Sequence, residues 1–471
     1  MWTGPQGSGD ASGSYCYRAA LLLDGQWQGL WAMWHPPGYP ILVALASLAT
    51  GKLLTPWWAG NLLNLACYVW LIVLADRLLA PRVSHVASRL VCMALLAFNE
   101  NLAQWQSAPL SEAVFLVMCL GAIVAYDRDQ IEPRHALVAG LLAGAAFTVR
   151  LEGGAAAAGL LAYTAWRTRS LPLTAMALGG CAIGGGWLAV QVDFFERGSQ
   201  YRLLYNSFEV KTVRTVADLL EIGRSVLTLW LPYVLLLPQW CALAIGVQRF
   251  ATEGPSGRRF NALAAATVVP ILGAIALTVP MKRTGVVLLA PAMIWIAAAA
   301  DQWWTAERGG RGHWRRAFVS ALVVLACAVE AGRVARLALP AGRVKDPVER
   351  QVEALRANGA TRGPIWAFGN ERLIYGILGW PERFDYRNAA SIDGPVLGDR
   401  SAEAFVAELR QRRYRYLTFE LPPGDSERVS HVDWHSLPPR RDLLNAIVAA
   451  PARFGLRVLA GPSTVPVFEI E

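Results

Sequence analysis

Charged residues are scarce in this sequence. Only 17% of its 471 residues are Asp, Glu, Lys or Arg, and the mean hydropathy is +0.33. Soluble domains usually carry about a quarter charged residues. The composition therefore excludes a simple soluble protein.

The scarcity of charge is confined to one part of the chain. Residues 340–471 contain 18 basic and 17 acidic residues, so the first 339 residues hold 44 of the 79 charges. The net charge of +9 comes almost wholly from basic residues scattered between apolar runs in the first part. Because such residues do not form a phosphate-tracking patch, we expect no nucleic-acid partner.

Two further sequence signatures are missing. The seven cysteines are dispersed, six of them within apolar runs. This pattern suggests neither a disulfide framework nor a metal cluster, and it assigns the cysteines to packing. No convincing glycine-rich nucleotide-binding loop follows a strand, so a nucleotide substrate or cofactor is not indicated.

Ten apolar runs approach the length needed to cross a hydrocarbon core of about 30 Å. They lie at 57–79, 85–101, 111–127, 135–150, 152–166, 172–193, 226–248, 260–280, 283–300 and 315–338. A further run at 38–54 would reverse every later loop if it crossed, so we expect a short helix in the outer interface. The predicted fold is a polytopic α-helical membrane protein of about ten spans with this interfacial helix.

Lys and Arg in the connections set the orientation. Fourteen of these basic residues fall on one side of the predicted membrane and three on the other. Because cytoplasmic loops carry the excess of Lys and Arg, residues 1–56, the 194–225 loop and residues 340–471 are predicted to lie outside. Met1 would then lie outside without a preceding span or signal peptide, so we expect a further helix upstream.

The last segment, 340–471, has the pattern of a small extracytoplasmic α/β domain, after a first extracytoplasmic loop at 1–56 and a multi-span domain at 57–339. Ser401 as N-cap, with Glu403 in the first turn, starts a helix that runs to about residue 413. The other expected elements are helices at 346–358 and from 442, and strands ending at 368, at 414–421 and paired near 455–470.

Polar residues gather in the predicted outer loops. Asp10 lies in a glycine-rich loop that continues through Tyr15, where partial desolvation would raise its basicity. A solvated loop aspartate is the alternative. His35 opens a turn that Pro36 and Pro37 make rigid. A purely structural role in this turn is the alternative to a functional role for His35.

Three further groups of charged residues border apolar runs. Glu112 begins one run, where a carboxylate is expensive unless it caps a helix or serves a site. Arg150 and Glu152 share a tight outer turn, which a local ion pair would explain. Lys282 and Arg283 could hold a lipid-linked phosphate or only extend to lipid headgroups.

Together these motifs resemble a known family. They are Gly9-Asp10 with Tyr and Ala following, His35-Pro36-Pro37-Gly38-Tyr39-Pro40, Ser111-Glu112, Arg150-Leu151-Glu152-Gly153 and a late Lys282-Arg283 before a span. This order, with an extracytoplasmic C-terminal domain, resembles the C-type integral-membrane glycosyltransferases. The branch of protein O-mannosyltransferases and lipid A aminoarabinose transferases is the closest within that family. The resemblance covers essentially the whole chain.

The resemblance implies a multi-pass cell-membrane enzyme of the cell envelope. Such an enzyme transfers a hexosyl or pentosyl group from a polyprenyl-phosphate sugar to a lipid, glycan or protein acceptor on the extracytoplasmic side, with inversion. Asp10 would act as general base on the acceptor or orient it. Glu112 would be a second acidic group near the acceptor or a cation. A divalent cation is compatible with this scheme, but no ligand spacing demonstrates one.

The resemblance also implies a basic group that binds the donor phosphate, because departure of polyprenyl phosphate leaves extra negative charge that fixed cations stabilise. Its predicted members are Lys282 and Arg283, with Arg150 and Lys211 behind them. The residues predicted to position the acceptor or the loop are Tyr15, His35 and Glu152.

Two other functions fit a polytopic protein. A transporter or flippase would show paired Gly- or Pro-broken helices and charges within spans. Gly184-Gly185-Gly186 is one flexible point without an evident counterpart, and the polar groups gather on the outer face. A non-catalytic assembly subunit with a degenerate site is the other alternative.

Overall fold

The structure is a computed structural model. It describes residues 15–25, 27, 36–99, 102, 109–189, 237–252, 254–277, 286–305, 328–329, 331–332, 355, 357, 365–368, 401–419, 438–460 and 466–471. The chain divides into two compact units. One comprises Met1–His35, Pro40–Gly60 and Pro340–Glu471, and the other, called the helical unit below, comprises Pro36–Tyr39 and Asn61–Leu339.

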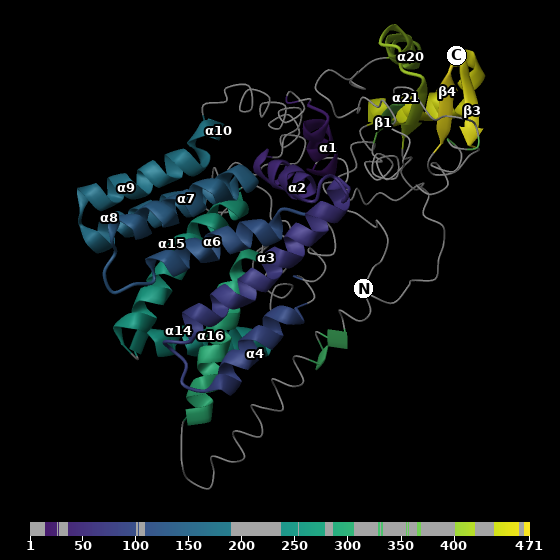
Figure 1. Ribbon diagram of the computed structural model, residues 1–471. Helices are drawn as coiled ribbons and strands as arrows, with labels where there is room; N and C mark the ends of the chain where they lie inside the picture. The colour runs from purple at the N-terminus through teal and green to yellow at the C-terminus, as the bar shows by residue number, and fades with distance from the viewer. Residues whose placement is uncertain are drawn as a thin grey trace. The chain divides into compact units, whose positions relative to one another are not determined.

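Figure 1 shows the described helices, most of which overlap an apolar run of the sequence. They are α1 Tyr17–Leu23, α2 Gly38–Ala49, α3 Pro56–Leu79, α4 Val86–Ala97, α6 Glu112–Tyr126, α7 Pro133–Val149, α8 Glu152–Thr168, α9 Leu171–Cys181, the π-helical turn η3 Ala182–Gly186, α10 Trp187–Ala189, α14 Leu237–Thr252, α15 Pro255–Leu277 and α16 Val286–Thr305. Each predicted span except the last overlaps one of these helices. Of the last, 315–338, only the helical residues 328–329 and 331–332 are described.

Two described helices, Pro56–Leu79 and Val287–Thr305, are long and apolar enough by themselves to cross a membrane. Five shorter apolar stretches are Gly38–Ala49, Val86–Ala97, Glu112–Tyr126, Pro133–Val149 and Leu171–Gly186. The membrane fold is thus built from helices of unequal length, and the number of spans stays a prediction.

Helix α2 corresponds to the predicted interfacial helix but ends five residues earlier than expected. Gly51 and Lys52 follow it with φ angles of 63° and 64°, which is the left-handed conformation that commonly ends a helix. The hydroxyl of Ser47 donates to the carbonyl oxygen of Leu54 at 2.7 Å and closes the turn. At 12 residues, α2 is about 18 Å long, too short to span a bilayer.

One face of α3 is apolar and exposed. Leu62, Leu65, Val69 and Val73 follow one another at three- or four-residue spacing and are 37% to 58% exposed. This spacing places them on one side of the helix. A contiguous apolar surface of this kind is typical of a helix that faces lipid hydrocarbon.

Glycines allow α7 to pack closely on α9 and η3. A Cβ at Gly144 would lie 2.4 Å from the carbonyl oxygen of Cys181, and a Cβ at Gly180 would lie 2.4 Å from that of Leu137. Such small residues let membrane helices approach backbone to backbone. The Gly184–Gly186 run, interpreted from the sequence as a flexible point, is the π-helical turn η3, where Gly184 and Gly185 also pack on α7.

Ion pairs gather at one end of the helical unit, called the arginine end below. Arg82, between α3 and α4, pairs with Asp127 after α6, and Asp127 pairs with Arg259 of α15 at 3.1 Å. Arg249 of α14 pairs with Asp301 of α16 at 2.8 Å. These contacts bring the ends of α3, α6, α14 and α16 and the start of α15 together, as alternating spans require.

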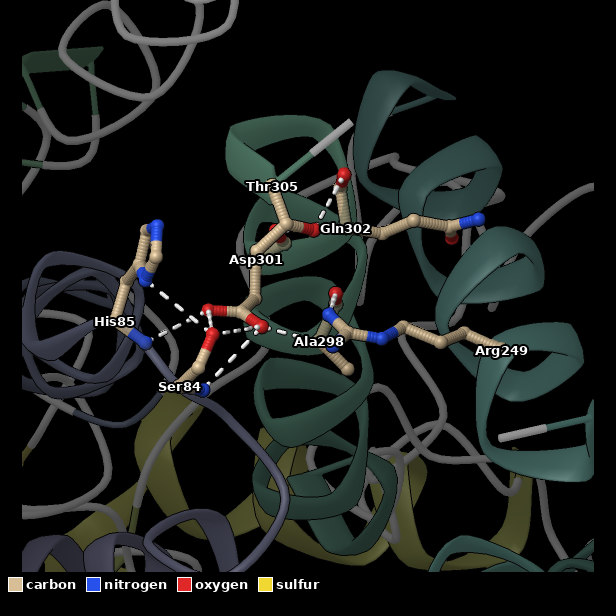
Figure 2. A network of polar contacts seen from close by, with 7 residues as sticks. All are labelled: Ser84, His85, Arg249, Ala298, Asp301, Gln302 and Thr305. Carbon is tan, nitrogen blue, oxygen red and sulfur yellow. Dashed lines mark hydrogen bonds and ion pairs between the residues drawn. The ribbon is translucent and has the colours of Figure 1, made fainter. Parts of the chain in front are cut away.

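The Asp301 carboxylate organises part of this end (Figure 2). Its Oδ1 accepts a hydrogen bond from the backbone N–H of His85 at 2.9 Å. Its Oδ2 faces Ser84, whose backbone N–H lies at 3.4 Å and whose hydroxyl lies at 3.3 Å. Arg249 also donates to the carbonyl oxygen of Ala298. Because Asp301 is fully buried, these donors replace the water that an ionised carboxylate loses on burial.

The described residues between 365 and 471 form a small sheet with accompanying helices, the α/β pattern that the sequence predicts there. Its strands are β1 Ile365–Phe368, β2 Tyr416–Phe419, β3 Leu456–Ala460 and β4 Val467–Ile470, in the sheet order β1-β2-β4-β3. β1 and β2 are parallel and the other two pairs are antiparallel. The helices α20 Ala402–Gln411 and α21 Pro438–Ala449 contribute to a core with Trp366, Leu417 and Phe468 of the sheet.

The helix boundaries of this domain confirm one prediction and correct two others. The Ser401 hydroxyl accepts from the N–H of Ala404 at 3.2 Å, so the predicted N-cap is confirmed. α20 ends two residues before the predicted 413, because Arg413 adopts a φ of 61°. α21 begins at Pro438, earlier than the predicted 442, since proline is tolerated in the first helical turn.

Candidate active site

Four of the predicted site residues lie in the described part of the chain. They are Tyr15, Glu112, Arg150 and Glu152, whereas Asp10, His35, Lys211, Lys282 and Arg283 lie outside the described residues. Tyr15 is buried just before α1 and belongs to the other unit. The remaining three meet in the helical unit.

Arg150 and Glu152 lie in the turn that joins α7 to α8. The backbone N–H of Gly153 donates to the carbonyl oxygen of Arg150 at 2.9 Å. A Cβ at Gly153 would come within 2.3 Å of the backbone nitrogen of Phe147, so this close approach of α8 to α7 requires glycine. The Arg-x-Glu-Gly spacing therefore makes a tight hairpin that places Arg150 beside Glu152.

Glu112 is the first residue of α6 and is 5% exposed. Ser111 precedes it at the N-cap position, but its hydroxyl makes no capping hydrogen bond. Glu112 therefore lies in the first turn of α6, without side-chain capping by Ser111. Helix capping alone thus does not account for this Ser-Glu pair.

Arg150 joins both carboxylates, and we call Glu112, Arg150 and Glu152 the acid–arginine cluster. Nη1 of Arg150 donates to Oε1 of Glu112 at 2.6 Å, and Nη2 donates to Oε1 of Glu152 at 2.9 Å. The guanidinium also lies 5.9 Å from the centre of the Phe115 ring. The expected local ion pair between Arg150 and Glu152 is confirmed, and it is part of this three-residue cluster.

The acid–arginine cluster carries a net charge of −1 when all three groups are ionised. Glu112 and Glu152 begin α6 and α8, and Arg150 follows the last residue of α7. Helix dipoles favour anions at N-termini and cations at C-termini, so each charge lies at the helix end that stabilises it. A cluster with this charge can accept a proton or stabilise a positive charge that develops during a reaction.

The Pro-Pro-Gly-Tyr turn packs against the α7 end of this site. Pro36, Pro37 and Gly38 are buried. A Cβ at Gly38 would lie 2.5 Å from the Oγ1 of Thr148, two residues before Arg150. The glycine of this motif therefore lets the turn approach the segment that carries the arginine.

The same turn is hydrogen-bonded to the α6 end of the site. The hydroxyl of Tyr39 donates to Oδ1 of Asn64 at 2.9 Å, and Nδ2 of Asn64 donates to the carbonyl oxygen of Leu110 at 3.0 Å. Leu110 lies two residues before Glu112. Three motifs that are separate in the sequence thus converge in one buried region.

Asn64 is the polar residue that the sequence analysis missed. It is fully buried within α3, a helix whose exposed face is apolar. A polar side chain inside a membrane span is rare and often marks a site or a helix contact. This rule could have identified Asn64 without the structure.

The acid–arginine cluster lies at the end of the helical unit opposite the arginine end. Helix α6 begins at Glu112, and Asp127 of the arginine end follows its last residue. Its 15 residues correspond to about 22 Å of helix. The polar groups are therefore concentrated at the two ends of α6 and not at its middle.

The described residues fit a divalent cation poorly. Among them, no three His, Cys, Asp or Glu side chains come together. The two carboxylates of the acid–arginine cluster already face the guanidinium of Arg150. Since Mg²⁺ and Ca²⁺ take several oxygen ligands, we assign no reaction step to a metal.

Solved structures show where this fold occurs. ArnT from Cupriavidus metallidurans in the apo state matches with a TM-score of 0.58 and 12% identity over 98% of this chain and 93% of ArnT. ArnT bound to undecaprenyl phosphate matches with a TM-score of 0.51 and the same identity and coverage.

A second similar protein is the arabinofuranosyltransferase AftD from Mycobacteria. It matches with a TM-score of 0.51 and 14% identity over 98% of this chain, which spans 38% of AftD. No family model and no curated protein matches the sequence itself. The chain therefore shares the fold of ArnT and of the matched part of AftD.

Proposed function

We propose that this chain is a membrane glycosyltransferase that moves a sugar from a polyprenyl-phosphate donor to an extracytoplasmic acceptor. The observation that carries the proposal is the acid–arginine cluster, which lies where the family motifs converge. The fold supports it, because a structure with the same fold binds undecaprenyl phosphate.

The acidic groups would act on the acceptor. Asp10 takes the proton of the acceptor hydroxyl or amine as general base, and Glu112 assists it or orients the acceptor. The attacking atom then forms its bond to the anomeric carbon while the bond from that carbon to the phosphate oxygen breaks, which inverts the configuration. Sugar transfer passes through an oxocarbenium-like state, and the net negative cluster would stabilise its positive charge.

Basic groups would receive the leaving polyprenyl phosphate. Lys282 and Arg283 precede α16 by a few residues and are our first candidates, with Lys211 behind them. A predicted phosphate contact of Arg150 also belongs to the proposal. However, Arg150 already bonds two carboxylates. We therefore infer that its main role is to fix Glu112 and Glu152 relative to each other, and that phosphate binding is secondary.

The test measures release of polyprenyl phosphate from a panel of polyprenyl-phosphate sugars by membranes that contain the full gene product. We expect Asp10→Asn and Glu112→Gln to lower kcat by about 10²- to 10⁴-fold, the usual range for loss of general acid–base catalysis. Asp129→Asn is the control, because its side chain is 92% exposed at the arginine end. Lys282→Ala with Arg283→Ala should raise the apparent KM for the donor.

Two outcomes would overturn parts of the proposal. Full activity of Asp10→Asn would exclude its role as base, and an unchanged donor KM in the double lysine–arginine variant would leave those residues to lipid headgroups. Folded protein that releases polyprenyl phosphate from none of the donors would favour a transporter, a flippase or a non-catalytic subunit.

A further inference from the structure

Asn64 has no part in the reaction described above, yet its side-chain amide makes two directed hydrogen bonds next to the acid–arginine cluster. The carbonyl oxygen of Leu110 can only accept, so the Nδ2 of Asn64 must face it and donate. The Oδ1 then faces Tyr39, whose hydroxyl must donate. The orientation of the amide is thus determined at both ends.

The Asn64 amide connects the segment just before α6 to the turn that carries Tyr39 by hydrogen bonds. Leu110 contributes the peptide group before Ser111, and Glu112 follows as the first residue of α6. A hydrogen bond to the Leu110 carbonyl restricts the plane of that peptide group. It thereby restricts the position from which the Glu112 side chain reaches Arg150.

Tyr39 connects this bond to the other half of the cluster. Its neighbour Gly38 packs against Thr148, close to Arg150. The turn therefore contacts the α7 end through Gly38 and the α6 end through Tyr39 and Asn64. Glu112 and Arg150, which bond each other at 2.6 Å, are each linked to the same turn.

We propose that Asn64, together with Tyr39, is a positioning residue that sets the location of Glu112 relative to Arg150. The kinetic part of this inference rests on the proposed function. Misplacing a catalytic group by about 1 Å can lower the rate about 10²-fold. The hydrogen-bonded amide would act on turnover through Glu112 and not on binding of the donor.

The experiment compares two tyrosine hydroxyls: that of Tyr39, which donates to a residue of α3, and that of Tyr68, which belongs to α3. Tyr39→Phe removes the hydroxyl that donates to Asn64, whereas Tyr68→Phe removes a hydroxyl that donates to the carbonyl oxygen of Leu96 at 2.6 Å. Tyr68 lies one turn from Asn64 on the same helix, so it controls for the loss of a comparable bond. Asn64→Leu removes the hydrogen bonds to Tyr39 and Leu110 while keeping the same branching and number of side-chain heavy atoms.

We expect Tyr39→Phe and Asn64→Leu to lower kcat per folded molecule by about 10- to 100-fold, with donor KM changed less than about twofold. Tyr68→Phe should retain the kcat of the parent protein. A kcat for Asn64→Leu equal to that of Tyr68→Phe, or an effect on KM alone, would overturn the positioning role.

A second measurement does not depend on activity. We expect the Tm losses of Asn64→Leu and Glu112→Gln to be less than additive in the double variant, because coupled residues give non-additive changes. Tyr68→Phe with Glu112→Gln should be additive. Additive losses for Asn64 would reject the inference, whereas absence of any donor turnover by the parent protein would reject only the proposed function.

Discussion

At the scale of single residues, two buried carboxylates illustrate how this chain compensates charge. Asp301 is fully buried and accepts hydrogen bonds from Ser84, His85 and Arg249. Glu112 is almost as deeply buried and accepts from Arg150. A buried ion pair contributes little net stability, but removal of one partner leaves an uncompensated charge.

Asp301→Ala should therefore destabilise the protein by about 3–5 kcal/mol, because it leaves the buried Arg249 guanidinium and two backbone donors without their acceptor. Urea or thermal unfolding of the detergent-solubilised protein measures the loss. Asp129→Ala is the matched control. Asp129 also pairs with an arginine, Arg259, but its side chain is exposed, so this ion pair should contribute little to stability. Equal losses for the two variants would contradict this account.

The sequence identified Glu112 and Arg150 separately, because each is a charge at the border of an apolar run. It could not show that they bond each other, since they are 38 residues apart and their contact depends on how α6 packs on α7. Asn64 is one of two asparagines in the same apolar run, and the sequence does not show which of them is buried or which groups it contacts.

At the scale of elements, backbone contact between helices explains several glycines. Gly144 on α7 and Gly180 on α9 each face the backbone of the other helix. Their four-residue spacing to Gly140 and Gly184 resembles the small-xxx-small pattern of membrane helices. Gly184 and Gly185 of η3 therefore have a packing function.

Gly144→Leu should separate α7 from α9 and lower the Tm of the folded protein, because its Cβ would meet the carbonyl oxygen of Cys181 at 2.4 Å. Gly179→Leu is the control, since a Cβ there meets nothing within 4 Å. Thermal unfolding of both variants in the same detergent tests this prediction. A similar Tm for the two would show that α7 and α9 do not pack as described.

The paired strands of the C-terminal domain carry a second testable feature. Glu469 of β4 bonds Arg457 of β3, opposite it in the sheet, and Arg415 at 3.3 Å. The hydrogen bond from Arg457 holds the pKa of the Glu469 carboxyl below its usual value. The folded state therefore binds its proton less readily than the unfolded state does.

A carboxyl with a depressed folded-state pKa stabilises the fold above its unfolded pKa of about 4.3, and this stabilisation is lost as the pH falls further. Hydrogen exchange of β3 and β4 amides should accelerate between about pH 5 and about pH 3 beyond the intrinsic effect of pH. Glu469→Gln should remove part of that dependence. An identical pH dependence in this variant would mean that Glu469 contributes nothing.

At the scale of the whole molecule, the helical unit has two chemically different ends. The arginine end carries interlocked arginine–aspartate pairs, and the other end carries the acid–arginine cluster. Excess Arg and Lys marks the cytoplasmic side of membrane proteins. On this basis we expect the candidate active site on the extracytoplasmic side.

Labelling of single cysteines in intact cells tests this orientation. Both native side chains are exposed, so a cysteine at either position can react with any thiol reagent that reaches it. Asp129→Cys at the arginine end should resist a membrane-impermeant reagent because it is predicted to lie on the cytoplasmic side. Glu403→Cys in the C-terminal domain should react because it is predicted to lie outside. Cys241→Ser provides the background, since Cys241 is exposed. Labelling of Asp129→Cys without permeabilisation would reverse the predicted topology.

The sequence by itself determined the positions of most of the described helices in the helical unit, because apolar run length and scarcity of charge are local properties. It also determined the cap of α20 and the identity of the border charges. Only the tertiary structure decided which polar groups meet, since the contacts of Arg150 with Glu112 and of Asn64 with Leu110 join residues that are 38 and 46 positions apart in the chain. Local pattern sets each element, and packing between elements assembles the site.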